Sequence, residues 1–227
     1  MIEEIIEAWK KEDLLKQSLR IISNMFDTTH LMFEAAKSEL ENSEKNLSKD
    51  YITQKDIEVN QMQIEVRRKV LEHLSFSPAQ DITASLVFLY VVNDLERIGD
   101  YCKNMEDEAL VHNKHASPKN KDYPERISKV AERVSKQFLK TKNAFLENDK
   151  IKANEIVNEY SEIKKSINEI ITGLEKESRM SSGRAITHAL YTRHIKRVAA
   201  HLKNIASSVV NPFDRVGYKP REESKTQ

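Results

Sequence analysis

Two acidic side chains, Glu96 and Asp100, lie four residues apart in the segment DLERIGDYCKNM. If this segment is helical, the two residues share one face, about one turn apart. Like charges at this spacing oppose helix formation by roughly 0.2–0.5 kcal/mol, so the pair favours a bound cation. Asp56 and Asn60 repeat the spacing on an earlier segment. Oxygen ligands from two neighbouring helices would suit a hard or borderline ion such as Mg²⁺, Mn²⁺ or iron.

This metal hypothesis has two simpler alternatives. An acidic pair on a long, highly charged helix is usually a solvated face. In addition, Thr53 and Asp56 fit a capping box, in which the acid only caps a helix. The residue spacing leaves open whether these four side chains bind a metal ion, cap a helix or contact solvent.

An internal repeat gives Glu96 and Asp100 counterparts 100 residues later, and Asp56 and Asn60 align with residues 104 positions later. The segment 94–105 aligns with 194–205, so that Lys103 falls over Lys203. Where the first copy has its candidate ligands, the second copy has Lys196, Ala200, Tyr160 and Lys164. We therefore expect a single metal site, in the first repeat only. In the second repeat we expect an interaction surface for an anion or an acidic partner, unless its basic side chains are simply solvated; its residues are Arg193, Lys196 and Arg197.

The elements that must position these side chains are helices. Only 4 Gly and 5 Pro occur in 227 residues, too few for the turns of an all-β sandwich or barrel. Apolar residues recur at helical spacing, and the expected helices cover about 13–43, a segment that includes 59–74, then 78–110, 124–146, 149–176 and 181–210. We predict an all-α fold of two tandem three-helix bundles, with antiparallel helices as in spectrin repeats.

Local signals set the expected helix ends. Ser77 followed by Pro78 predicts the start of the third helix, and a polar break at 46–53 separates the first two. The run 86–92 is apolar on all sides, which predicts a buried helix at the interface between the repeats. The expected domains are 1–116, 117–212 and a flexible tail, 213–227.

The net charge of +1 hides an opposition between the two halves. Residues 1–116 carry 14 basic and 22 acidic side chains, a net of −8, whereas the remainder carries a net of +9. The single cysteine, Cys102, lies in an apolar stripe and is expected to be a buried thiol in a reducing compartment. No signal peptide is recognisable, and no apolar stretch approaches the roughly 18–20 residues of a membrane span. We expect a cytoplasmic protein.

Enzyme motifs are missing from the sequence. It contains no HExxH, Walker, GxGxxG or GxSxG pattern, and no Glu precedes a His by three residues as in ferritin-like di-iron sites. His194 and His201 have no acid at helical spacing, so we interpret both as surface or interface residues. These absences disfavour the enzyme classes that the motifs define.

The segment DLERIGDYCKN, with the preceding SPAQDITASLVFLYVVN, resembles the signature of the PhoU family. The resemblance implies a cytoplasmic, non-catalytic regulator of phosphate uptake and signalling that binds metal through acidic motifs. The resemblance places the family's metal-binding motif at Glu96 and Asp100, with Asp56 and Asn60 as partners on the preceding helix. The implied partners are a phosphate transporter or a sensor-kinase component, with a homodimer left open. We expect no nucleic acid, and membrane contact only through a partner.

Two alternatives to this function stay open. The first is a metal-free helical adaptor, an accessory subunit of a phosphate or sodium-phosphate transporter, whose acidic patch is only a docking surface. The second is a carboxylate–metal enzyme, which the missing histidine ligands disfavour.

Overall fold

A computed structural model describes residues 2–41, 49–76, 80–114 and 122–218. These ranges form six α-helices and one short 3-10 helix: α1 (Ile2–Glu41), α2 (Lys49–Phe76), α3 (Ile82–Lys114), α4 (Asp122–Leu146), α5 (Lys150–Glu175), α6 (Ser182–Val210) and η1 (Phe213–Arg215). The described part of the chain contains no strand. The predicted all-α fold is confirmed.

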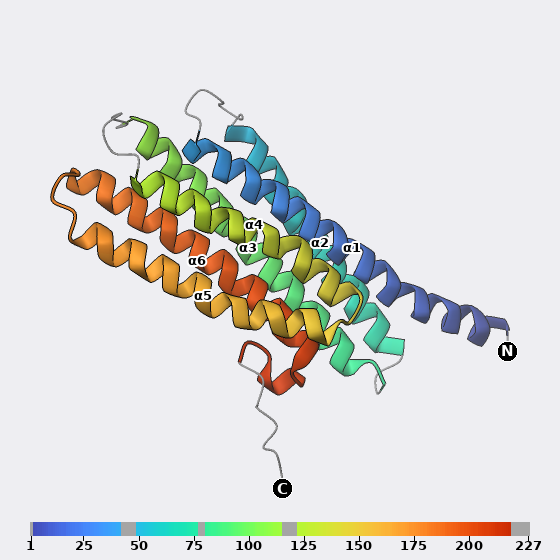
Figure 1. Cartoon of the computed structure of the whole chain (residues 1–227). Helices are drawn as coiled ribbons and strands as arrows, with labels where there is room; N and C mark the ends of the chain where they lie inside the picture. Colours follow the sequence, from blue (N-terminus) through green and yellow to red (C-terminus); the bar gives the residue numbers. More distant parts are fainter. Residues whose placement is uncertain (1, 42–48, 77–79, 115–121, 219–227) are drawn as a thin grey trace, which may run out of the picture.

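The helices form two three-helix bundles that lie side by side (Figure 1). Helices α1, α2 and α3 pack against one another, and α4 packs with α5 and α6. The bundles meet where α3 lies against α6 and α1 against α4, and a single apolar core runs through both. The predicted boundary between the repeats, after residue 116, lies outside the described residues.

Helix α1 supplies much of the first core. Ile22, Met25, Phe26 and Phe33 are almost fully buried at helical spacing, and burying a side chain of this size contributes about 1.5–3 kcal/mol. The helix begins at Ile2 rather than near residue 13 as predicted, because no Gly or Pro interrupts the segment.

The start of α2 corrects the predicted break at 46–53. The helix begins at Lys49, and Ile52 in its first turn is 1% exposed. Burial of this apolar side chain fixes the first turn within a segment that reads as polar. Thr53 is therefore inside the helix and cannot be its N-cap, so the capping-box interpretation of Asp56 is wrong.

The start of α3 also differs from the prediction. The helix begins at Ile82, and the backbone N–H of Ser85 donates to the carbonyl of Asp81 at 2.9 Å. Asp81 thus has the N-cap role that we assigned to Ser77, which lies outside the described residues together with Pro78. In the apolar run 86–92, Val91 and Val92 are buried and the other five side chains are half-buried.

The helices of the second repeat begin and end within two residues of the predicted positions. Asp149 caps α5, and its Oδ1 accepts from the backbone N–H groups of Ile151 and Lys152, both at 3.0 Å. Helix α6 follows Ser181 and ends before Asn211. These boundaries were predictable because capping residues are local signals.

The start of the expected flexible tail folds back onto α6. The Asn211 side-chain amide donates to the carbonyls of Arg215 and Tyr218, and the Gly217 N–H donates to Ser207 Oγ at 2.6 Å. Gly217 has φ +90°, a conformation that favours glycine. Residues 213–218 are therefore part of the fold, in contrast to the prediction.

Candidate functional site

The four predicted metal ligands gather on one side of the first bundle. Asp56 and Asn60 come from α2, and Glu96 and Asp100 from α3. A fifth residue, Lys103, lies between the helices: its Nζ is 2.8 Å from Asp56 Oδ2 and 3.2 Å from Asp100 Oδ1. Asn60 Nδ2 donates to the same Asp56 oxygen at 3.3 Å. The predicted residues are brought together, but a lysine links the two aspartates.

Glu96 lies in the electric field of the two aspartates. Partial burial raises the pKa of its carboxyl group, and the nearby charges of Asp100 and Asp56 raise it further. Arg97 acts in the opposite direction; its side chain contacts Glu96 Oε2 at 3.7 Å and Asp100 Oδ2 at 3.3 Å. Repulsion from the two aspartates, of which only Asp56 lies across the α2–α3 interface, thus adds to the effect of burial on Glu96.

Lys103 and Arg97 neutralise this acidic cluster in the structure. Although partial burial lowers the pKa of Lys103, hydrogen bonds to Asp56 and Asp100 outweigh it and raise the pKa overall. Among the described residues, no three His, Cys, Asp or Glu side chains form a ready-made metal site. An ion would therefore have to displace the Lys103 ammonium group.

One oxygen of the cluster lacks a partner. Asp56 is 8% exposed, and its Oδ1 is buried without a hydrogen bond in the described part of the chain. Leaving such an atom unpaired costs about 1–3 kcal/mol. A Cβ built on Gly99 would lie 3.6 Å from this oxygen, so the missing side chain leaves space beside it. A buried, unpaired carboxylate oxygen next to two further carboxylates fits a hard cation.

Cys102 takes no part in this cluster. It lies fully buried in the apolar core. Burial raises the pKa of its thiol well above the usual range, so the sulfur stays protonated. The prediction of a buried, unreactive thiol agrees with this environment.

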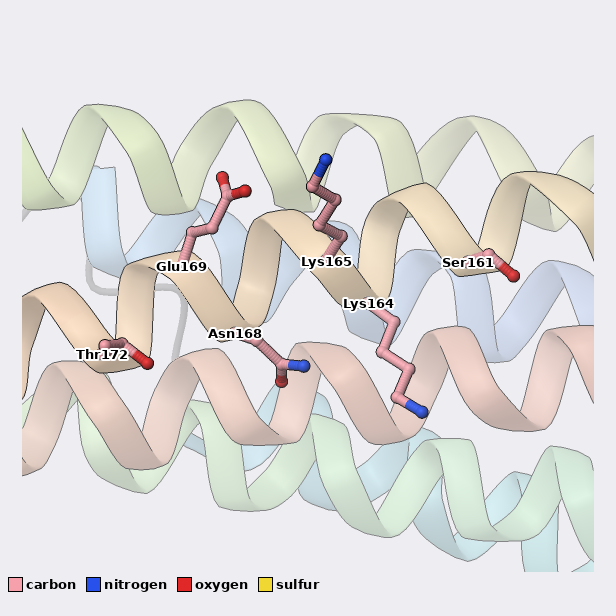
Figure 2. A pocket seen from close by; sticks show the side chains of 6 residues that line it. All are labelled: Ser161, Lys164, Lys165, Asn168, Glu169 and Thr172. Carbon is pink, nitrogen blue, oxygen red and sulfur yellow. The ribbon is translucent and has the colours of Figure 1, made fainter.

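In the second repeat the counterpart positions line a cleft of about 370 Å³ between α5 and α6. Its lining consists of the four counterparts, the other two predicted basic residues and one apolar residue: Tyr160, Lys164, Ile171, Arg193, Lys196, Arg197 and Ala200. Figure 2 shows the adjoining hollow on the outer face of α5, where Lys164 and Asn168 point toward α6. The sequence repeat thus correctly grouped residues that the fold brings together.

The cleft is electropositive. Partial burial lowers the pKa of Lys196, and the positive charges of Lys164, Arg193 and Arg197 lower it further. Lys196 Nζ donates to the neutral side chain of Asn168 at 2.8 Å. Within the described residues none of these four cations forms an ion pair with a carboxylate. The surface predicted for an anion is therefore a concave site without a counterion.

A polar contact at the interface between the repeats was not predicted from the sequence. His201 Nδ1 and Asp94 Oδ1 are 2.7 Å apart, and the Tyr101 ring lies 5.9 Å from the His194 ring and 5.7 Å from the His201 ring, centroid to centroid. Burial raises the pKa of Asp94, although the hydrogen bond from His201 opposes this. Both histidines are interface residues, as predicted, but the acid comes from another helix. The offset of 100 residues, which pairs position 94 with 194 and 101 with 201, was the available signal.

Comparisons with known proteins give a consistent result. The family model described as PhoU domain matches residues 22–109 and 127–209. The structure is similar to that of PhoU from Pseudomonas aeruginosa, with TM-score 0.81 and 19% identity over 88% of this chain and 96% of that one.

A second similar structure is the phosphate transport system regulatory protein PhoU from Streptococcus pneumoniae, with TM-score 0.71 and 17% identity over 89% of this chain and 94% of that one. At this level of identity, both structures support the fold alone. The search of curated proteins gives no match. None of the helices in the described ranges has the length and apolar character needed to cross a membrane.

Proposed function

The chain belongs to the PhoU family, and we propose that it regulates phosphate transport by binding one metal ion in its first repeat and contacting partner proteins. Family models match both repeats, and the similar Streptococcus pneumoniae structure is described as a phosphate transport system regulatory protein. The observation that carries the metal proposal is the unpaired, buried Asp56 Oδ1 beside Gly99.

We propose that Asp56, Glu96 and Asp100 hold the ion, with the Asn60 side-chain oxygen as a further ligand. A divalent or iron-type cation would supply the positive charge that Lys103 now provides to Asp56 and Asp100. Because these ligands come from both α2 and α3, metal binding would fix the two helices relative to each other. Metal occupancy would then change the surface that the first bundle offers to a phosphate transporter or a sensor kinase.

Metal titration with purified protein tests this proposal. We expect Mn²⁺ to bind the wild-type protein with a stoichiometry near one, measured by calorimetry and by metal analysis after dialysis. The variant Glu96→Gln with Asp100→Asn should bind at least about tenfold more weakly. A control variant, Glu155→Gln with Glu159→Gln, removes an acidic pair of the same spacing from the surface of α5 and should bind like the wild type. Equal affinity in the wild-type protein and the Glu96 and Asp100 variant would reject the site.

A metal-free adaptor is the second candidate function. It is favoured by the ion pairs of Lys103 and Arg97, which already neutralise the carboxylates. The titration separates the two candidates, since an adaptor would show no saturable metal binding in any variant. Either candidate acts without catalysis, so the appearance of phosphate-ester hydrolysis that is lost in the Glu96 and Asp100 variant would contradict both.

A pull-down from phosphate-starved and phosphate-replete cells tests the proposed partners. We expect the wild-type protein to capture a phosphate-transporter subunit or a sensor kinase in one of the two conditions. The Glu96 and Asp100 variant should lose the difference between conditions, because it cannot bind the ion. Capture of neither partner would contradict the regulatory proposal without affecting the metal titration.

A further inference from the structure

The cleft between α5 and α6 has the features of a ligand site of its own. Its volume of about 370 Å³ lies within the range of small-molecule pockets. Four of its seven lining residues are basic, and no described residue that lines it is acidic. The site therefore concentrates positive charge in a concave space, which distinguishes it from lysines scattered over an open surface.

Two helices hold the four cations in place. Arg193, Lys196 and Arg197 are three and four residues apart on α6 and so share one face. Lys164 reaches toward them from α5 (Figure 2). The Lys196 ammonium group is held by the Asn168 side chain, which leaves two of its three N–H bonds for another acceptor. Burial lowers the pKa of Lys196 and the neighbouring cations lower it further, a repulsion that a bound anion would relieve.

The differences from the first repeat create the space for a ligand. Ala200 stands where the first repeat has Asp100, and its small side chain lines the cleft instead of filling it. Tyr160 replaces Asp56, and Lys203 Nζ lies 5.7 Å above its ring. The substitutions thus remove the carboxylates and at the same time open a cleft whose lining is basic and aromatic.

We propose that this cleft binds a small anion that carries several phosphoryl groups. Arginine guanidinium groups bind phosphate oxygens in bidentate pairs, and lysines add compact positive charges. A chain of phosphoryl groups can contact cations on both walls at once, whereas a single carboxylate of a peptide would contact one or two. Free polyphosphate and the triphosphate of a nucleotide share this chemistry. The proposal does not depend on metal binding in the first repeat.

Calorimetric titrations at constant ionic strength test the proposal with tripolyphosphate, ATP and orthophosphate as probes. We expect tripolyphosphate, ATP or both to bind with a stoichiometry near one and more tightly than orthophosphate. Tighter binding of tripolyphosphate indicates free polyphosphate as the ligand, and tighter binding of ATP indicates a nucleotide. Affinity should fall as salt is raised, because the interaction is between charges.

Variants locate the binding site. Lys164→Ala and Arg197→Ala should each weaken binding at least about tenfold, since each removes a charge-assisted contact. Lys165→Ala is the matched control: the residue is adjacent in sequence and exposed, but it points away from α6 (Figure 2). All three side chains lie at the surface of helices, so circular dichroism should show unchanged folding.

Three results would overturn the inference. The first is the absence of saturable binding, the second is equal affinity for orthophosphate and tripolyphosphate, and the third is equal weakening by Lys164→Ala and Lys165→Ala. The Glu96 and Asp100 variant should bind tripolyphosphate like the wild type. Failure of this inference is therefore separable from failure of the metal proposal.

Discussion

The two repeats place the same lysine in opposite environments. Lys103 on α3 lies between Asp56 and Asp100, and these contacts raise its pKa. Its counterpart, Lys203 on α6, lies over the ring of Tyr160 and donates to the carbonyl of Gly217. Burial lowers the pKa of Lys203, with Asp94 opposing this shift. In the first repeat carboxylates pair with the lysine, whereas in the second repeat an aromatic ring and a backbone carbonyl take their place.

Under the two proposals, a repeated helical scaffold binds ligands of opposite charge in its two copies. The helices of each pair, α2–α3 and α5–α6, pack against each other and carry the aligned positions of the two repeats. Substitution at a few positions turns an acidic cluster that would attract a cation into a basic cleft that would attract an anion. The comparison predicts that equivalent variants in the two repeats differ in their effects on stability and on ligand binding.

Removing the lysine should lower the free energy of unfolding more in the first repeat than in the second. Lys103→Met leaves the buried carboxylate of Asp56 without its cation, and we expect the free energy of unfolding to fall by about 2 kcal/mol. Lys203→Met should cost less than about 1 kcal/mol, because burial already disfavours its charge. Urea unfolding of both variants without metal measures the difference.

Metal should then stabilise the Lys103→Met variant more than the Lys203→Met variant. If the Asp56 cluster binds an ion, adding Mn²⁺ at 100 times its Kd stabilises Lys103→Met by about 2.7 kcal/mol. The Lys203→Met variant should respond no more than the wild type does. A Mn²⁺ response that is the same in all three proteins would argue against the proposed competition between Lys103 and the ion.

Exchanging glycine and alanine at one pair of equivalent positions should change the free energy of unfolding by up to about 1 kcal/mol. Gly99 and Ala199 are equivalent, and a Cβ at Gly99 would make only ordinary contacts, the nearest at 3.5 Å to Met32 Cε. Gly99→Ala should therefore stabilise the metal-free protein by up to about 1 kcal/mol, and Ala199→Gly should destabilise it by about the same amount.

The Gly99→Ala substitution should also change the affinity for Mn²⁺. Because the added methyl group would lie beside Asp56 Oδ1, Gly99→Ala should weaken Mn²⁺ binding while it raises stability. Thermal unfolding and calorimetry on the same sample check both effects. Unchanged Mn²⁺ affinity in a more stable protein would show that the open space beside Asp56 is not needed by a ligand.

The smallest effects concern pH, and they should have opposite signs. The raised pKa of Glu96 means that its contribution to stability is complete below its ordinary pKa of 4.5 and is lost as pH rises through the raised value. The lowered pKa of Lys196 means that stability is gained as pH rises from the lowered value toward 10.5. The carboxylates repel in one repeat, and the cations repel in the other.

Two variants isolate these contributions. Glu96→Gln should flatten the stability profile in the acidic range, and Lys196→Gln should flatten it in the alkaline range, each by roughly 0.2–0.5 kcal/mol. Unfolding curves recorded across pH without metal or phosphate measure both. A profile that changes in the same range for both variants would show that the two clusters do not have opposite electrostatics.

The fold was predictable from local signals in the sequence. Asp149, whose side chain caps α5, and Asn211, which follows the end of α6, lie at the predicted helix boundaries of the second repeat. The start of α2 was misplaced because burial of Ile52 determines it, which a polar stretch of sequence does not reveal. The start of α3 was misplaced because Ser77 was taken as the cap in place of Asp81. Tertiary packing decided where the sequence pattern was ambiguous.

The candidate site was only partly predictable. Helical spacing and the repeat grouped Glu96 with Asp100, and the second helix added Asp56. The role of Lys103 was missed, because its partner Asp56 is 47 residues away and the pairing requires the three-dimensional arrangement of α2 and α3. The bond between His201 and Asp94 was missed for the same reason, since only residues on one helix were compared.

The most direct test of opposite ligands in the two repeats is to measure binding of both ligands to the same three proteins. Mn²⁺ and tripolyphosphate are titrated separately into the wild-type protein, the Glu96→Gln and Asp100→Asn variant, and the Lys164→Ala and Arg197→Ala variant. We predict that the first variant loses only Mn²⁺ binding and the second only tripolyphosphate binding. Loss of both ligands in either variant, or of neither in both, would contradict the assignment of a cation site to one repeat and an anion site to the other.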